Sequence, residues 1–186
     1  ELTGTVRLFG REVDDIPSWE RGLAAGNVFQ DPRSQFFANE VAGEIAFGCE
    51  NYGLDHELIV ERVHGAASEL DIAPLLEEKV RLLSYGMRQR VAIASAKAID
   101  PPLYVMDEPS ANLDNEATEQ LGNLIRALKQ QGKTVLLAEH RLYYLRGIAD
   151  RIVYLANGRI ADSFTPAELV ALDPARIEAL GLRSAN

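Results

Sequence analysis

The sequence predicts an α/β fold in which a mostly parallel sheet carries a helical subdomain and a small antiparallel element at its start. Short apolar runs alternate with segments that repeat apolar residues at helical spacing, which is typical of parallel strands joined by crossover helices. Polar residues follow directly after the runs 26–29, 103–106 and 134–138, as they do at the carboxyl ends of parallel strands. Between residues 34 and 100 the pattern is mostly helical.

Length, composition and charge limit the class of protein. A chain of 186 residues with 47% hydrophobic content suits one domain with a sizeable core. No apolar segment reaches the length of a membrane span, and we expect no signal peptide. The single cysteine, Cys49, is interpreted as a packing residue because its surroundings are apolar. The net charge of −9 argues against a nucleic-acid partner, since such proteins normally present a basic face.

The first part of the chain is predicted to form two short strands and a turn-rich loop. Residues 5–9 alternate in polarity and predict a strand that ends at Gly10. Residues 11–20 are mixed and polar, and they predict a connection with a short helix. Residues 26–29 predict a second strand, and the turn-forming residues 31–35 follow it as a loop.

Three helices are predicted in the middle of the chain. Apolar residues recur at helical spacing from 39 to about 49. Asp55 is a plausible N-cap for a helix that runs to about residue 70. Ser84 is a good N-cap for a third helix, at about 86–98.

The second half returns to alternating strands and helices. The expected strands and helices, in order, are a buried strand 103–106, a helix 116–130, a buried strand 134–138, a helix 141–149, strands 151–155 and 159–161 around the turn Asn157-Gly158, and a helical tail 166–182.

The pair Asp107 and Glu108 follows the predicted strand 103–106, and Pro109 then ends the strand. Adjacent carboxylates at a strand end suit metal-assisted phosphoryl chemistry. One can hold Mg²⁺ through water, and the other can orient or deprotonate an attacking water. Taken alone, the pair fits an acidic turn better than a catalytic site.

Four motifs in order resemble those of the ATP-binding cassette (ABC) ATPases. Residues 28–32 are similar to the Q-loop, and residues 83–94 to the signature motif. Residues 103–114 are similar to the Walker B motif and the D-loop after it, and His140 to the switch histidine. The segments Gln35-Phe36-Phe37 and Glu44 to Gly48 look most like the energy-coupling-factor branch, which imports vitamins and transition metals.

The resemblance implies a P-loop NTPase-like fold, an ATPase that binds ATP and Mg²⁺, and a role for each matching residue. The implied roles are Mg²⁺ binding by Asp107, general-base catalysis by Glu108, contact with Mg²⁺ and the attacking water by Gln30, γ-phosphate sensing by His140, dimer contact by Asp114, and clamping of a partner's nucleotide by Ser84 and Gly86. It also implies a second ABC ATPase subunit or cassette, a transmembrane transporter subunit, and a place at the cytoplasmic face of the cell membrane.

Two positions depart from the signature pattern. Tyr85 stands where the family has a second glycine, and Met87 stands where it has glutamine. Because glycine allows close backbone approach, Tyr85 is expected to crowd the phosphate of the partner's nucleotide. We therefore expect a weak composite site and a non-identical partner or a second cassette in the same protein.

No phosphate loop of the form Gly-x-x-x-x-Gly-Lys-Ser/Thr occurs in the sequence. The nearest approach is Gly132-Lys133-Thr134. It has Ala127 in place of the first glycine and leads from helix into strand, the reverse of a phosphate loop. The expectation is a single ABC ATPase domain over 1–186, truncated before the phosphate loop, with a helical subdomain at about 34–100. Such a chain would be inactive by itself.

Two other interpretations remain open. A soluble ABC ATPase of DNA repair or translation would share these motifs, but it would carry coiled-coil insertions, tandem cassettes or basic surfaces, and none is visible here. The chain as given could also be a non-catalytic interaction fragment.

Overall fold

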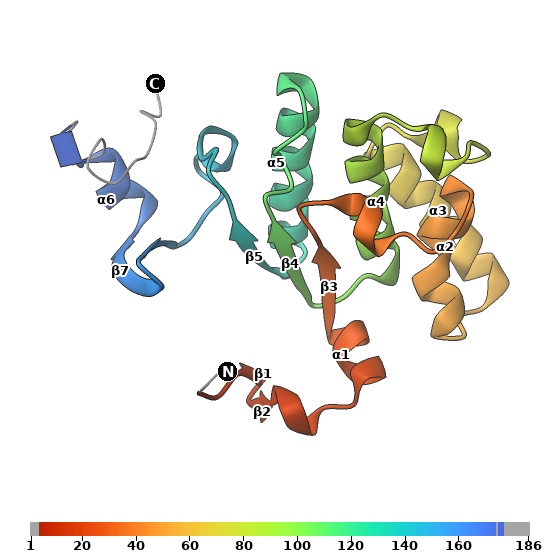
Figure 1. Cartoon of the computed structure of the whole chain (residues 1–186), viewed down its shortest axis with the longest axis horizontal. Helices are drawn as coiled ribbons and strands as arrows, with labels where there is room; N and C mark the ends of the chain where they lie inside the picture. The colour runs from red at the N-terminus through yellow and green to blue at the C-terminus, as the bar shows by residue number, and fades with distance from the viewer. Residues whose placement is uncertain (1–3, 174, 177–186) are drawn as a thin grey trace.

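The computed structural model describes residues 4–173, 175 and 176. Its centre is a parallel sheet in the order β3 (Ala25–Val28), β4 (Leu103–Asp107) and β5 (Thr134–Ala138), seen in the middle of Figure 1. The register pairs Val28 with Met106, and Asp107 with Ala138. Residues that follow the three strands therefore meet at one edge, as the sequence predicted.

The helix α5 (Asn115–Gln130) connects β4 to β5 and contacts β5. Its buried apolar stripe comprises Leu121, Leu124, Ile125 and Leu128. This amphipathic pattern turns one face of the helix to the core and leaves the other in water.

Three helices gather beside β3 (Figure 1). They are α2 (Val41–Asn51), α3 (His56–Glu69) and α4 (Tyr85–Ile99), and α4 also contacts β3. Cys49 is fully buried against the Ala98 carbonyl, and burial raises the pKa of its thiol, which confirms it as a packing residue. Asp55 occupies the N-cap position of α3, as predicted, although its carboxylate makes no capping hydrogen bond.

Smaller elements lie at both ends of the described chain. The antiparallel pair β1 (Arg7–Leu8) and β2 (Arg11–Glu12) precedes α1 (Ser18–Ala24). The hairpin of β6 (Ile152–Ala156) and β7 (Arg159–Phe164) lies beyond β5 with α6 (Pro166–Val170). Short 3-10 helices occupy Val13–Asp15, Pro32–Gln35, Ala73–Leu75, Val80–Leu82 and Tyr143–Leu145. Within the described residues, no helix combines the length and hydropathy that crossing a membrane requires.

The first strand and the helix near residue 145 differ from their predictions. The strand predicted at 5–9 shrinks to Arg7–Leu8, because Phe9 and Gly10 have positive φ angles of 49° and 84° and form a turn. The helix predicted at 141–149 is wrong. A 3-10 turn at Tyr143–Leu145 replaces it, and Gly147 then takes a φ of 70°.

The burial of β5 and the length of the tail also differ from prediction. β5 is not buried: Leu136 is 62% exposed, because β5 is the outer strand of the described sheet and its second face lacks cover from the described residues. The tail helix α6 ends at Val170, and part of the predicted range, 174 and 177–182, lies outside the described residues.

Candidate active site

The two adjacent carboxylates at the end of β4, Asp107 and Glu108, differ in their backbone conformation and surroundings. Alternate residues Tyr104 and Met106 are almost fully buried and fix the strand, while Asp107 is exposed at its last position. Glu108 then adopts a left-handed conformation with a φ of 43°, and its N–H donates to the Ala138 carbonyl at 2.9 Å. A non-glycine residue in this conformation costs on the order of 1–3 kcal/mol, so the surrounding structure has to hold it there.

The Glu108 carboxylate lies between two side chains from neighbouring strands. Its Oε2 accepts a hydrogen bond from Gln30 Nε2 at 2.9 Å, and its Oε1 lies 2.9 Å from His140 Nε2. The glutamate side chain is 25% exposed and the histidine 83% exposed, so the cluster opens to solvent on the histidine side. The structure thus brings together the three residues that the sequence proposed as catalytic.

The donor set near Asp107 suits a magnesium ion with few protein ligands. Among the described residues, no group of three or more histidine, cysteine, aspartate or glutamate side chains gathers to hold a metal. Mg²⁺ commonly uses one or two protein oxygens and completes its shell with water and substrate phosphates. The exposed carboxylate of Asp107, at the end of β4, and the amide oxygen of Gln30, after the neighbouring strand β3, are donors of the kind that fit that pattern.

Glu139 is a site residue that sequence reasoning missed. Its carboxylate accepts hydrogen bonds from the Ser110 hydroxyl, from the Tyr144 hydroxyl at 2.8 Å and from the His140 N–H at 2.8 Å. Ser110 is fully buried, and burial together with the Glu139 charge raises the pKa of Tyr144. The available signal was a carboxylate placed directly between a strand and the predicted switch histidine.

Arg141 adds a second link between the segment after β4 and the segment after β5. Its guanidinium donates to the carbonyls of Ser110 and Leu113, each at 3.3 Å. The segment after β5 therefore holds the segment after β4 through both a carboxylate and a guanidinium. These links fix the spacing between Glu108 and His140.

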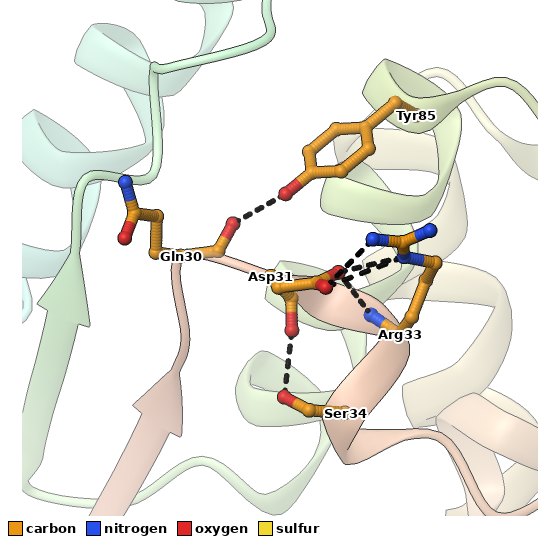
Figure 2. A network of polar contacts seen from close by, with 5 residues as sticks. All are labelled: Gln30, Asp31, Arg33, Ser34 and Tyr85. Atoms are coloured by element: carbon orange, nitrogen blue, oxygen red, sulfur yellow. Dashed lines mark hydrogen bonds and ion pairs between the residues drawn. The ribbon is translucent and has the colours of Figure 1, made fainter.

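The signature residues lie at the start of α4. Ser84 Oγ accepts from the Met87 N–H at 3.3 Å, which confirms its capping role. A Cβ on Gly86 would lie 3.1 Å from the Asn112 carbonyl, so the glycine allows α4 to approach the loop after β4. Tyr85 extends its hydroxyl to the Gln30 carbonyl at 2.7 Å (Figure 2).

Asp114 caps α5. Its carboxylate accepts from the Ala117 N–H at 2.8 Å, and its carbonyl accepts from the Thr118 hydroxyl at 2.7 Å. The sequence proposed a dimer contact at this position. In this structure the Asp114 side chain caps the start of α5.

We predict that Asp114→Ala lowers the free energy of unfolding by about 1 kcal/mol, because alanine leaves the N–H groups at the start of α5 without a cap. Asp114→Asn is the matched control and should retain most of the stability, since asparagine caps equally well. Urea unfolding of the chain measures both. Equal stability of wild type and Asp114→Ala would contradict the capping assignment.

The parallel sheet carries an acidic pair, a glutamine and a histidine at its strand ends, and its fold is that of the P-loop NTPase-like ABC ATPases, as the solved structure described below shows. The chain belongs to the ABC transporter family, whose model matches residues 1–111. The family predicted from the motifs is thereby confirmed.

Several relatives are similar over most of this chain. A putative ABC transporter ATP-binding protein of Treponema denticola is 38% identical over 186 residues, which is 100% of this chain and 38% of that protein. The energy-coupling factor transporter ATP-binding protein EcfA1 of Geobacillus kaustophilus is 36% identical over 180 residues, covering 96% of this chain and 64% of that protein. The chain therefore spans well under half the length of the Treponema relative.

A solved structure shares the fold. CbiO1 from Clostridium perfringens, described as part of the ABC transporter complex cbiONQ, aligns with a TM-score of 0.71 and 30% identity. The alignment covers 87% of this chain and 64% of that one. The predicted α/β fold is confirmed by this likeness.

Proposed function

We propose that the protein containing this chain is the ATP-hydrolysing subunit of an energy-coupling-factor type ABC importer of vitamins or metal ions. The observation that carries this proposal is the Glu108 carboxylate held between Gln30 and His140, each at 2.9 Å, at the carboxyl ends of three parallel strands. A carboxylate fixed in this way can accept a proton from an attacking water. The energy-coupling factor relatives support the transporter branch.

Each residue of the cluster has a distinct task in this proposal. Asp107 would hold Mg²⁺, which would supply neutralisation of charge on the terminal phosphates when bound. Gln30 contacts the ion and the water, and its amide restrains the Glu108 carboxylate. His140 contacts the γ-phosphate and restrains the opposite oxygen of Glu108. Glu108 is the general base.

The proposed partners are a second cassette and a transmembrane subunit at the cytoplasmic face of the cell membrane. Ser84 and Gly86 would contact a nucleotide held by the second cassette, and Asp114 would lie near that interface. The helix start at Ser84 supports phosphate contact, because free N–H groups and the helix dipole favour anions.

The test is phosphate release from Mg-ATP by the protein when a phosphate loop is present. We expect turnover that requires Mg²⁺ and rises with the partner cassette. Absence of turnover with both cassettes and Mg²⁺ present would overturn the proposal.

For the 186-residue chain alone, we predict no useful ATP binding. A phosphate loop provides backbone N–H groups and a lysine, and losing several charge-assisted hydrogen bonds, at about 1.5–3 kcal/mol each, should place the dissociation constant above about 1 mM. Three of the lysines are already paired with carboxylates: Lys97 with Glu69, Lys129 with Asp150 and Lys133 with Asp100.

Calorimetry with Mg-ATP measures this binding. The positive control is the same titration on the protein with its phosphate loop, where we expect a micromolar isotherm. A micromolar isotherm for the 186-residue chain would show that another part of it cradles phosphate.

A further inference from the structure

Tyr85 joins two parts of the site that are far apart in sequence. It is the first residue of α4, and its hydroxyl donates to the backbone carbonyl of Gln30 at 2.7 Å (Figure 2). The two residues are 55 positions apart. The tyrosine that replaces the family's glycine at this signature position therefore makes a hydrogen bond within the chain itself.

Gln30 is consequently held from two sides. Its side-chain amide donates to Glu108 Oε2 at 2.9 Å, while its carbonyl accepts from Tyr85. The first contact reaches the proposed general base, and the second reaches the start of α4. A shift of the Gln30 backbone would therefore move the amide that restrains Glu108.

The loop after Gln30 is tied mainly to itself. The Asp31 carboxylate accepts from the Arg33 N–H at 3.1 Å and from its guanidinium at 2.9 and 3.0 Å (Figure 2). The Ser34 hydroxyl donates to the Asp31 carbonyl at 2.8 Å. Phe29 N–H donates to Gln35 Oε1 at 3.0 Å. These bonds stiffen the turn itself. Two side chains of α4 reach this segment: the Tyr85 hydroxyl donates to the Gln30 carbonyl at 2.7 Å, and Gln89 Nε2 donates to the Phe29 carbonyl at the longer distance of 3.5 Å. The shorter bond is the one made to Gln30 itself.

We propose that Tyr85 is a positioning residue that sets the place of Gln30, and through it the orientation of Glu108. This inference rests on the proposed ATPase function. Reaction rates fall steeply when a catalytic group is displaced by about 1 Å, so loss of the Tyr85 bond to Gln30 affects turnover more than substrate binding. Because α4 also carries Ser84 and Gly86, the bond links the surface that meets a partner's nucleotide to the chain's own general base.

Two variants separate positioning from crowding of the partner's phosphate. Tyr85→Phe removes the hydroxyl and keeps the ring, while Tyr85→Gly removes both. If Tyr85 positions Gln30, Tyr85→Phe should lower kcat about five-fold, the worth of one typical hydrogen bond, with KM within about two-fold of wild type. Tyr85→Gly should be no more active than Tyr85→Phe. If the ring merely crowds the phosphate, Tyr85→Phe equals wild type and Tyr85→Gly is faster.

The matched control is Tyr154→Phe, the same chemical change on β6, where no hydrogen bond of the hydroxyl is found among the described residues. Activity is measured on the protein assembled with its phosphate loop and partner. Amide hydrogen exchange of residues 29–35 is measured in parallel on the 186-residue chain. Tyr85→Phe should speed exchange in this loop, and Tyr154→Phe should not.

The outcomes distinguish the two proposals. Lack of ATPase activity in the wild type overturns the proposed function, while the exchange experiment still reports on the tether. Normal wild-type activity with an unchanged kcat in Tyr85→Phe overturns the positioning role. A lowered kcat without faster exchange in residues 29–35 also overturns it, because Tyr85 would then act elsewhere.

Discussion

Replacing Glu108 with glutamine should lower ATP hydrolysis by about 10²–10⁴-fold and leave ATP binding nearly unchanged in the protein that carries a phosphate loop. Glutamine has nearly the same shape and can still accept one of the two hydrogen bonds that Glu108 receives from Gln30 and His140. It cannot take a proton from the attacking water. Single-turnover phosphate release and nucleotide titration measure the two effects separately.

The matched control for this experiment is Glu119→Gln, an equal change at an exposed position of α5. It should leave both hydrolysis and binding unchanged. Near-normal turnover in Glu108→Gln would remove the general-base assignment and shift attention to another proton acceptor in the cluster.

Replacing Glu139 with alanine should lower the free energy of unfolding by about 2–3 kcal/mol, because hydrogen bonds to a charged group are worth about 1.5–3 kcal/mol and their partners become unsatisfied. The affected groups are the buried hydroxyls of Ser110 and Tyr144 and the N–H of His140. Urea unfolding of the 186-residue chain measures the loss. In the assembled protein, ATP turnover should also fall, since the spacing between Glu108 and His140 depends on this carboxylate.

Two further variants make this result specific. Glu139→Gln keeps an acceptor for the hydroxyls and should lose less stability than Glu139→Ala. Glu61→Ala, at an exposed position in α3, should change stability by less than about 0.5 kcal/mol, as is usual for surface substitutions. An equally small effect for Glu139→Ala would mean that the network around Ser110 and Tyr144 adds little to the fold.

The parallel sheet and α5 were predictable because their apolar patterns match their structural periods. The strand at 134–138 and the Asn157-Gly158 turn occur where they were predicted. Asn157 and Gly158 have positive φ angles of 52° and 71°, as this kind of turn requires. The segment 141–149 misled because its apolar residues have helical spacing. Tertiary contacts prevailed there: Tyr144 bonds to Glu139, and Gly147 turns the chain.

The proposed catalytic cluster of Gln30, Glu108 and His140 was predicted from the resemblance to the ABC ATPase motifs, and its meeting at one edge of the sheet from its place after three parallel strands. The position of Glu139 between a strand and the predicted switch histidine was a signal in the sequence. The hydrogen-bond partners of Glu139, Arg141 and Tyr85 could not be predicted, since they depend on which way a side chain points between elements distant in sequence. No periodicity encodes the 55-residue separation between Tyr85 and Gln30. Such contacts become visible only when the elements are packed together.

The left-handed backbone at Glu108, with its φ of 43°, sets stability against the proposed general-base activity at a single position. Glycine and asparagine adopt this conformation more readily than glutamate does. Selection for a sturdier fold alone would favour either of them, whereas selection for turnover retains the carboxylate. In a family member that no longer hydrolyses ATP, a carboxylate at this position is no longer required. The residue found there would therefore indicate whether a cassette still hydrolyses ATP or only binds its partner.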